Sequence, residues 1–341
     1  MRHIIIRKCV FTIAFAVILS IILLSSDVKL TKASGGVPIN SRYFSNDMQS
    51  ICKLYYDLNK DGYLSQSEIQ KIKKYEITDY EYEPDAGLMK KDFRGIEYFT
   101  SLEKINLEGV NIKNLKFERL SKLKSLSLYV CRLDSINFEK MYSLEEVSLV
   151  NVDMTSKYNF SKSKKLEKLI LNNKSGITKL DVSKLNKLEY LAVVGDIKKL
   201  DLSKNKKLKV LAVTAELKKL NILKNKKLEV LELNTPNLKK IDISKNKKLK
   251  NISVTAPVRQ MNLAGCKNLR TLSIKTNLTG LNIAGNNALK YLTIDAPLDN
   301  IDISALTALK NMTLTHVKIH EFNPMNTHLS NLYLNNCEIA T

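Results

Sequence analysis

Leucines recur at an almost constant interval along most of this chain. The first leucine of each unit follows the previous one by 20 to 22 residues, and these leucines are Leu102, Leu123, Leu144, Leu166, Leu188, Leu208, Leu228, Leu249, Leu269, Leu289, Leu309 and Leu329. Each unit opens with L-x-x-L-x-L or a conservative variant, such as Leu208, Leu211 and Val213. Because alternate residues of an extended chain share a face, this spacing predicts one short strand per unit with apolar residues buried on one side.

A second apolar pair in each unit, such as Leu200 and Leu202, predicts an inward face on the returning part of the chain. One coil cannot bury these side chains alone, whereas stacked coils bury them in a continuous core. The sequence therefore predicts a solenoid with a parallel β-sheet on one face and a mostly extended or short-strand return side. A recurring polar residue is expected to hydrogen-bond buried backbone groups, at Asn205, Asn225, Asn246 and Asn286, with Cys266 in the same register.

The unit is clearest in "LKSLSLYVCRL" (Leu123–Leu133) and "LSNLYLNNCEI" (Leu329–Ile339). These segments resemble leucine-rich repeats, and the resemblance covers residues 102–341. It implies parallel strands that line a concave face, which usually binds protein. One departure is that the ninth-position asparagine is mostly missing, being replaced by Asp196, Glu216, Pro236 or Pro257.

The first segment has the composition of a secretory signal peptide. Arg2, Arg7 and Lys8 precede an apolar run from Cys9 to Leu24, and small residues follow at Ala33 and Ser34. We expect residues 1–34 to be removed near Ala33, and the protein to be secreted or held at the cell surface. The alternative is an uncleaved membrane anchor, although the apolar run is shorter than the roughly 20 residues of a spanning helix.

The stretch "DLNKDGYLSQSE", Asp57 to Glu68, matches the EF-hand loop pattern at every position. It predicts a Ca²⁺ site whose oxygen donors are Asp57, Asn59, Asp61, the Tyr63 carbonyl, Ser65 and Glu68, with Gly62 at the sharp turn. Flanking helices are expected at 48–56 and 68–76. Two alternatives are a loop that folds without metal through Asx turns and half of a dockerin-type repeat.

A single, extracellular loop beside a repeat array is expected to be structural. Terminal coils of a solenoid need a cover over their apolar end. The repeats also resemble internalin-type surface proteins, which implies an N-terminal EF-hand-like helical cap. The expected domains are therefore a signal peptide at 1–34, the cap at 35–95, and a leucine-rich repeat domain of about twelve units at 96–341.

Charge is concentrated in the repeats. The formal net charge of the chain is +21; residues 36–101 carry 9 basic and 11 acidic residues, whereas residues from 102 onward carry 41 basic and 22 acidic ones. Lysines align from unit to unit, as at Lys198/Lys199 and Lys218/Lys219. This pattern raises the alternative of electrostatic attachment to an anionic wall polymer or glycan. A solvated, lysine-rich exterior without a dedicated ligand is the favoured explanation of the pattern. Nucleic acid is disfavoured because aromatic residues do not interleave with the lysines.

The residues between the inward leucines are expected to form the ligand surface on the concave face. Val210 is expected to face this surface, and the candidates for ligand contact are Tyr190, Val194, Thr214, Glu232, Ser253, Arg270, Lys275 and Tyr291. No nucleophile elbow, phosphate loop or acid pair is present, so we expect a protein without catalytic activity. The predicted function is recognition of an extracellular protein ligand, from a host or a bacterium, with Ca²⁺ bound structurally.

The cysteines are not expected to form disulfides. Cys131, Cys266 and Cys337 lie in coils too far apart for their α-carbons to approach within about 7 Å. Cys131 and Cys337 are predicted to be small buried fillers, and Cys52 lacks an obvious partner.

Overall fold

The structure is a computed structural model that describes residues 36–78, 87–154, 158–172, 176–319 and 327–339. The chain divides into two compact units, Met1–Lys32 and Ala33–Thr341, and every described residue belongs to the second. The predicted signal peptide, residues 1–34, lies outside the described residues. No helix of the described residues is long and apolar enough to cross a membrane.

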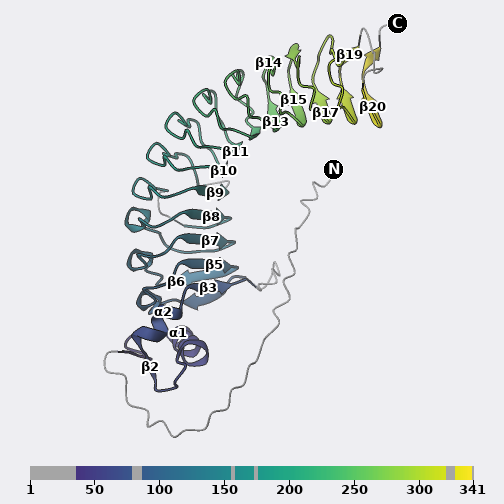
Figure 1. The fold of residues 1–341 in the computed structure, drawn as a ribbon. Helices are drawn as coiled ribbons and strands as arrows, with labels where there is room; N and C mark the ends of the chain where they lie inside the picture. Colours follow the sequence, from purple (N-terminus) through teal and green to yellow (C-terminus); the bar gives the residue numbers. More distant parts are fainter. Residues whose placement is uncertain (1–35, 79–86, 155–157, 173–175, 320–326, 340–341) are drawn as a thin grey trace. The chain divides into compact units, whose positions relative to one another are not determined.

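One parallel sheet of 13 strands runs through the second unit (Figure 1). Each of the twelve repeat units supplies one strand, and the head of the chain supplies the first, β3. The strands are β3 (Lys74–Ile77), β5 (Lys104–Glu108), β7 (Ser125–Tyr129), β8 (Glu146–Val150), β9 (Lys168–Asn172), β10 (Tyr190–Val194), β11 (Val210–Thr214), β12 (Val230–Asn234), β13 (Asn251–Ala256), β15 (Thr271–Thr276), β17 (Tyr291–Asp295), β18 (Asn311–Thr315) and β20 (Asn331–Asn335). The predicted solenoid is confirmed.

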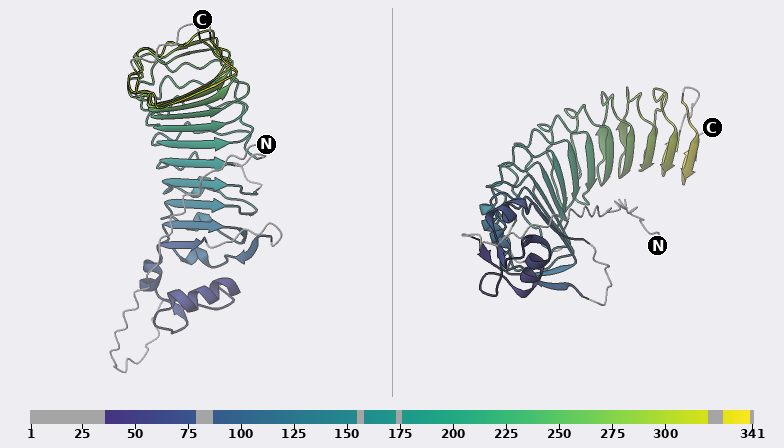
Figure 2. Two further views of the ribbon diagram at one scale, coloured as in Figure 1. Left: turned by 90° about the vertical axis from the view of Figure 1, so that its right-hand side faces the viewer. Right: turned by 60° about the horizontal axis from the view of Figure 1, so that its bottom comes forward.

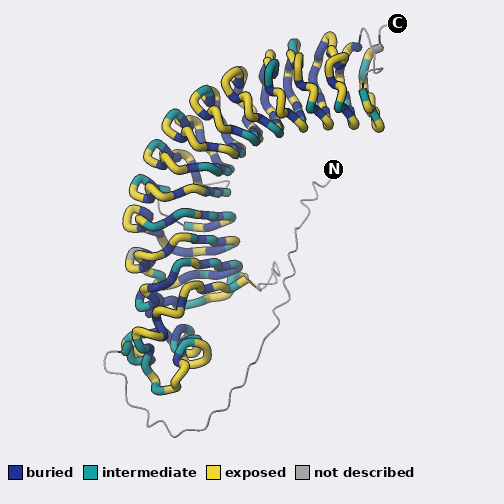
Figure 3. Tube along the Cα trace, viewed as in Figure 1, coloured by how far each residue is buried: buried dark blue, intermediate teal, exposed yellow. Residues whose placement is uncertain are grey.

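The core lies between this sheet and the return side. Leu191, Leu211 and Leu231 pair in register across β10, β11 and β12, and all three are fully buried. Along the strands of this sheet other than β20, buried residues alternate with half-buried or exposed ones (Figure 3). Fully burying one such leucine contributes roughly 1.5–3 kcal/mol, so the repeated pattern holds neighbouring coils in one register.

The return side carries little regular structure. It contains short parallel pairs, β4 (Met89–Asp92) with β6 (Val110–Lys113), β14 (Gln260–Asn262) with β16 (Gly280–Asn282), and β19 (Lys318–Ile319) with β21 (Glu338–Ile339). Two single-turn 3₁₀ helices, η3 (Phe117–Arg119) and η4 (Phe138–Lys140), lie in the first two units. Units of 20 to 22 residues leave too little chain for longer helices there. The coils follow a curve whose inner side is the main sheet (Figures 1 and 2).

Buried asparagines tie successive turns together. The Asn225 Nδ2 group donates to the Leu202 carbonyl at 3.0 Å and to the Asn205 carbonyl at 2.9 Å. Asn205, Asn246 and Asn286 each bond two carbonyls of the preceding coil in the same way. These asparagines are completely buried. The predicted ladder is therefore present, and it satisfies carbonyls that water cannot reach.

The head packs on the first repeat coil. It contains α1 (Asn46–Ile51), the π-helical turn η1 (Cys52–Tyr56), α2 (Gln66–Lys71), the antiparallel pair of β1 (Val37–Pro38) and β2 (Tyr63–Leu64), and the 3₁₀ turn η2 (Ile96–Tyr98). Aromatic contacts join these elements, with ring centroids of Tyr56 and Phe99 at 5.3 Å and of Tyr75 and Phe93 at 5.8 Å. The buried residues of the head form one core with those of the repeats.

The predicted second helix of the head is only partly correct. Helix α2 ends at Lys71, whereas helix was predicted for 68–76. Residues Lys74–Ile77 form strand β3, which pairs with β5 and buries Tyr75. Pairing with the sheet edge and burial of this aromatic side chain outweigh the local helical pattern. The described part of 35–95 therefore combines short helices with strands.

Candidate ligand-binding face and calcium loop

Three rows of outward side chains cover the concave face of the sheet, because the first, third and fifth residues of each strand point away from the core. The middle row is made of small residues over much of its length. Asn106, Ser127 and Ser148 pair in register on β5, β7 and β8, and Ala192 pairs with Ala212 on β10 and β11. Small side chains project only a short way from the sheet, so a ligand can approach its backbone closely along this row.

An apolar patch lies on strands β9 to β12, at the middle of the 13-stranded sheet. Its members point outward and are half-buried by their neighbours: Ile170, Tyr190, Ala192, Val194, Val210, Ala212 and Val230. Tyr190, Val210 and Val230 occupy one row, and Ile170, Ala192 and Ala212 occupy the next. We call these seven residues the apolar patch.

Polar residues border the apolar patch on both sides. The outward residues of β13 are Asn251, Ser253 and Thr255, all exposed. On the other side Glu146 and Ser148 face outward from β8. Lys168 reaches over the Tyr190 ring, with its Nζ 5.7 Å from the ring centroid. An apolar centre within a polar rim is the usual arrangement of a protein-binding surface.

The structure places seven of the eight predicted surface residues on the concave strands. Tyr190, Val194, Thr214, Glu232, Ser253, Lys275 and Tyr291 all occupy outward positions there. Arg270 does not, because β15 begins at Thr271. Arg270 instead belongs to a row at the strand entries, where its N–H and that of Thr271 both donate to the Lys250 carbonyl.

Four members of the apolar patch were not among the residues expected on this face: Ile170, Ala192, Ala212 and Val230. The sequence signal that could have identified them was the run of apolar residues at both inward and outward positions, as in "YLAVV" and "VLAVT".

Lys275 makes a 3.4 Å ion pair with Asp295, which also bonds His316 Nδ1 at 2.9 Å. These charges mark the polar end of the face towards β17 and β18.

The predicted calcium loop is a compact turn between η1 and α2. The two Asp57 oxygens accept from the N–H groups of Asp61 at 3.1 Å and of Gly62 at 3.0 Å. Asn59 and Asp61 each accept from the N–H two residues on, at 3.2 and 2.8 Å. Gly62 adopts φ +82°, which favours glycine. These are the Asx turns of the metal-free alternative.

Glu68 closes the loop at its other end. Its carboxylate accepts from Leu58 N–H at 2.7 Å, from Ser65 N–H at 2.9 Å and from the Ser65 hydroxyl at 2.7 Å. Burial raises the pKa of Glu68, but the hydrogen bonds from Ser65, Leu58 and Asn59 outweigh burial and lower the pKa below its ordinary value. Ser65 caps α2 and forms a capping box with Glu68.

The loop residues fit a calcium ion in chemistry, since all six predicted donors are oxygens. Within the described residues, however, no three His, Cys, Asp or Glu side chains are grouped so that they could hold a metal. The carboxylates are instead satisfied by backbone N–H groups of the loop. Calcium binding by this loop stays a prediction.

The cysteines form no disulfide in the described part of the chain. All four described cysteines are free, and burial, followed by the charge of Asp57, raises the pKa of Cys52 to about 12. Cys131 Sγ donates to the carbonyls of Leu107 and Tyr129 at 3.4 Å, as expected for a buried filler. Cys337 makes equivalent contacts but is only partly buried.

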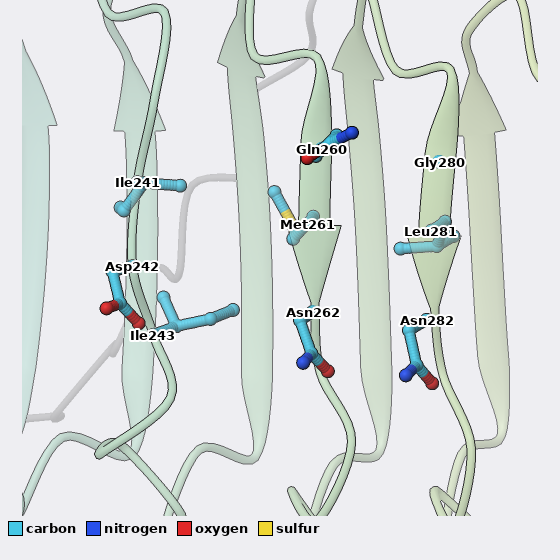
Figure 4. Close-up of a pocket in the computed structure, with 9 residues that line it drawn as sticks. All are labelled: Ile241, Asp242, Ile243, Gln260, Met261, Asn262, Gly280, Leu281 and Asn282. Atoms are coloured by element: carbon cyan, nitrogen blue, oxygen red, sulfur yellow. The ribbon is translucent and has the colours of Figure 1, made fainter.

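A shallow groove crosses the return side at β14 and β16 (Figure 4). Its apolar members are Ile241, Ile243, Met261 and Leu281, and Gly280 adds no side chain to it. The Asp242, Asn262 and Asn282 side-chain oxygens each accept a backbone N–H, at 2.8, 3.0 and 3.0 Å, which leaves Gln260 as the remaining polar member. The groove therefore offers no converging polar groups for a small ligand or a reaction.

The lysine columns occupy two separate parts of the coil. One column follows the strand ends on the return side, at Lys198/Lys199, Lys218/Lys219 and Lys239/Lys240. The other lies in the turns that lead into the strands, where lysines flank the ladder asparagine, as Lys204 and Lys206 flank Asn205. All of these lysines are exposed. At about 5 Å, two like charges in water repel by about 0.8 kcal/mol before screening.

No protein-family model and no curated protein matches this sequence. Solved structures do match it. The chain is similar to an internalin, InlF, of Listeria monocytogenes, with 19% identity over 91% of this chain and 95% of that one, at a TM-score of 0.77. It is also similar to the functional domain of InlJ of Listeria monocytogenes, which includes a cysteine ladder, with 22% identity over 89% and 72% of the two chains, at a TM-score of 0.70.

A third similar structure is the leucine-rich repeat ectodomain of the receptor kinase GASSHO1/SCHENGEN3 of Arabidopsis thaliana, in complex with CASPARIAN STRIP INTEGRITY FACTOR 2. The identity is 16% over 80% of this chain and 39% of that chain, at a TM-score of 0.57. These similarities assign the fold, which is a leucine-rich repeat solenoid of the kind found in internalins.

Proposed function

We propose that this protein is a non-catalytic binding protein of the cell surface or the extracellular space, and that its concave face recognises a protein ligand. The observation that carries the proposal is the apolar patch at the centre of a concave face whose other outward residues are mostly polar. Residues that contribute most to protein binding cluster near the centre of an interface and are shielded there by a polar rim. A similar solenoid, the plant receptor ectodomain, has been solved in complex with CASPARIAN STRIP INTEGRITY FACTOR 2.

The first prediction tests this face with one bulky charge. Ala212→Arg places a long side chain in the middle row of the apolar patch, and we expect it to weaken ligand capture by at least about tenfold, because its bulk obstructs close contact at the centre of the interface. The matched control is Thr313→Arg, which stands in the same row on β18. Quantitative capture of extracellular proteins by wild type and both variants gives the readout.

Proteins lost with Ala212→Arg and kept with Thr313→Arg are the ligands that the proposal expects. Both variants must unfold at temperatures close to that of the wild type, which thermal unfolding checks. The same set of proteins captured by wild type and Ala212→Arg would contradict the proposal.

We also propose that the loop 57–68 binds Ca²⁺ and that the ion has a structural role in an EF-hand-like cap over the first coil. The support is the complete set of oxygen donors, Asp57, Asn59, Asp61, Tyr63, Ser65 and Glu68. When bound, the ion would neutralise the carboxylates of Asp57, Asp61 and Glu68 and fix the turn between η1 and α2. The contact of the head with the first coil is consistent with this role.

Electrostatic attachment to an anionic wall polymer or glycan is the second candidate function. The observation that favours it is the alignment of exposed lysines in neighbouring coils. This mode of attachment uses a different part of the coil from the concave face, so both functions are compatible in one molecule.

A further inference from the structure

Lysines are concentrated in five successive turns of the solenoid, at 162–165, 184–187, 204–207, 224–227 and 245–248. Four of these turns contain three lysines and the turn at 184–187 contains two, so the row holds fourteen, all exposed. Each turn leads directly into one of the strands β9 to β13, which pair in register. We call this row of turns the lysine ridge.

The fold forces these lysines outward and holds them in place. In each turn the central residue points into the core, as Asn205, Asn225 and Asn246 do. The lysines flank this residue, and the ladder bonds of the asparagines fix the backbone of one turn against the next. The charges are therefore arranged on a rigid backbone before any ligand binds, which reduces the entropy lost on binding.

The lysines of the ridge form no ion pairs with carboxylates in the described part of the chain, although Lys247 Nζ donates to the Ala264 carbonyl at 2.6 Å. Within the described residues, no lysine of the ridge has a carboxylate oxygen within the 4.0 Å of an ion pair. Glu189 is paired with Lys209 at 2.6 Å, and Glu229 with Lys250 at 2.7 Å. Asp201 accepts from Ser203 N–H at 2.9 Å. Positive charge thus dominates the surface of these five turns.

The charge density of the lysine ridge is high. Neighbouring strands lie about 4.8 Å apart, so five turns extend over roughly 19–24 Å. Fourteen lysines over that length give about one positive charge per 1.4–1.7 Å, comparable with the one negative charge per 1.7 Å of duplex DNA. The spacing is also shorter than the Debye length of about 8 Å at physiological salt, so the lysines repel one another.

The lysine ridge also ends abruptly. In the next three coils the residues in register with Lys245 are Gly265, Gly285 and Ala305. Lys267 is the only lysine at the ridge positions of those three turns, which the structure describes in full. The local concentration points to a ligand of limited extent along the array.

We propose that the lysine ridge binds a linear polyanion with a sugar or polyol backbone and phosphate or sulfate groups, lying along the solenoid axis across the turns. The proposal rests on the second candidate function and assigns its site. A row one turn wide matches a single polymer strand rather than a plane of lipid headgroups. The five turns contain no aromatic residue, so they lack the stacking surface typical of single-stranded nucleic acid binding.

The test compares two variants that remove the same charge. The ridge variant changes Lys204, Lys207, Lys224, Lys227, Lys245 and Lys248 to Gln. The matched control changes the return-side residues Lys198, Lys199, Lys218, Lys219, Lys239 and Lys240 to Gln. All twelve are exposed, so both variants are expected to fold, and thermal unfolding verifies this. The probes are heparin for sulfate and poly(glycerol phosphate) for phosphate, with a single-stranded DNA oligonucleotide and anionic phospholipid vesicles as competitors.

We expect the ridge variant to bind at least one of the two polymers at least about tenfold more weakly at 50 mM salt, and its affinity to depend less steeply on salt concentration. The control should remain within about twofold of the wild type. The polymer that binds identifies whether phosphate or sulfate is the group recognised.

Equal loss in both variants would overturn the ridge site while leaving electrostatic attachment standing. Absence of wild-type binding to either polymer at 50 mM salt would overturn the second candidate function as well. Tighter binding to the oligonucleotide or to the vesicles than to both polymers would overturn the proposed ligand class. Ala212→Arg should not alter polymer binding, because it lies on the concave face.

Discussion

One polar residue begins the turn in each of seven successive coils. It is Asp in four coils and Asn in three, and in every coil its side-chain oxygen accepts the N–H two residues on, at distances between 2.8 and 3.1 Å. The residues are Asp181, Asp201, Asn221, Asp242, Asn262, Asn282 and Asp302. Asp and Asn both provide this oxygen, so the turn tolerates either residue.

The four aspartates differ from the asparagines in their response to pH. Backbone and side-chain hydrogen bonds from Ser203 lower the pKa of Asp201, and the pKa values of Asp181, Asp242 and Asp302 are lowered in the same way by the serine two residues on. A carboxyl group with a depressed folded pKa binds fewer protons in the folded state. Its stabilisation is therefore present above the unfolded pKa of about 3.9 and is lost as the pH falls towards the folded pKa.

The corresponding prediction concerns the replacement of all four aspartates by asparagine. At pH 7 we expect a small change in melting temperature, because Asn221, Asn262 and Asn282 already form the same turn. Below about pH 4 the wild type should lose stability more steeply than the variant. Thermal unfolding between pH 2.5 and 7 measures this difference, and parallel curves over that range would show that these carboxylates do not contribute.

At the scale of elements, the head shows why local sequence patterns are insufficient. The segment 68–76 has a helical pattern, yet α2 stops at Lys71 and Lys74–Ile77 joins the sheet as β3. The strand exists because β5 offers an edge and because Tyr75 is buried against Phe93. Neither neighbour is near in sequence, so the pattern of this segment alone could not reveal the strand.

The loop between η1 and α2 gives a prediction for calcium. With an extracellular-type dissociation constant of about 10⁻⁴–10⁻³ M, 10 mM Ca²⁺ should stabilise the folded protein by about 1.4–2.7 kcal/mol. Glu68→Gln should remove most of this gain, because it removes the charge of a predicted ligand. Thermal unfolding with Ca²⁺ and with EDTA measures the effect, and Mg²⁺ at the same concentration tests selectivity.

A control substitution distinguishes the loop from general charge effects. Glu103→Gln removes a carboxylate that pairs with Lys124 outside the loop, and it should leave the response to calcium unchanged. If the wild type melts at the same temperature in Ca²⁺ and EDTA, the loop is held by its hydrogen bonds alone and the calcium proposal is wrong.

At the scale of the whole molecule, the sequence predicted the solenoid because its information is periodic. Each coil repeats the inward leucines and the ladder position. The alignment of neighbouring coils, such as Leu208 with Leu228, therefore follows directly from the repeat spacing in the sequence. The apolar patch could not be recognised in the same way, since Ile170, Ala192 and Ala212 become neighbours only when strands from three coils pair. Arg270 was wrongly predicted to lie on the concave face, because β15 begins at Thr271, the residue after it.

The periodicity makes a prediction about the array itself. Contacts in a solenoid are mainly between neighbouring coils, so a coil can be removed if the two new neighbours fit. Deleting Leu208–Lys227 joins Lys207 to Leu228 and recreates the same junction. Val230 would then pair with Tyr190. Asn246 would meet the carbonyls of Leu202 and Asn205, which accept from Asn225 in the wild type. We therefore expect a folded protein that unfolds cooperatively.

The control deletion removes residues 208–217, half of the same coil. It places the return-side segment that begins at Lys218 where β11 should form, so inward leucines would face solvent and the ladder would lose its register. Circular dichroism and thermal unfolding should show native-like strand content for the full-coil deletion and its loss for the half-coil deletion. If both deletions are equally damaging, stability depends on contacts beyond neighbouring coils, and the repeat unit is not the unit of folding.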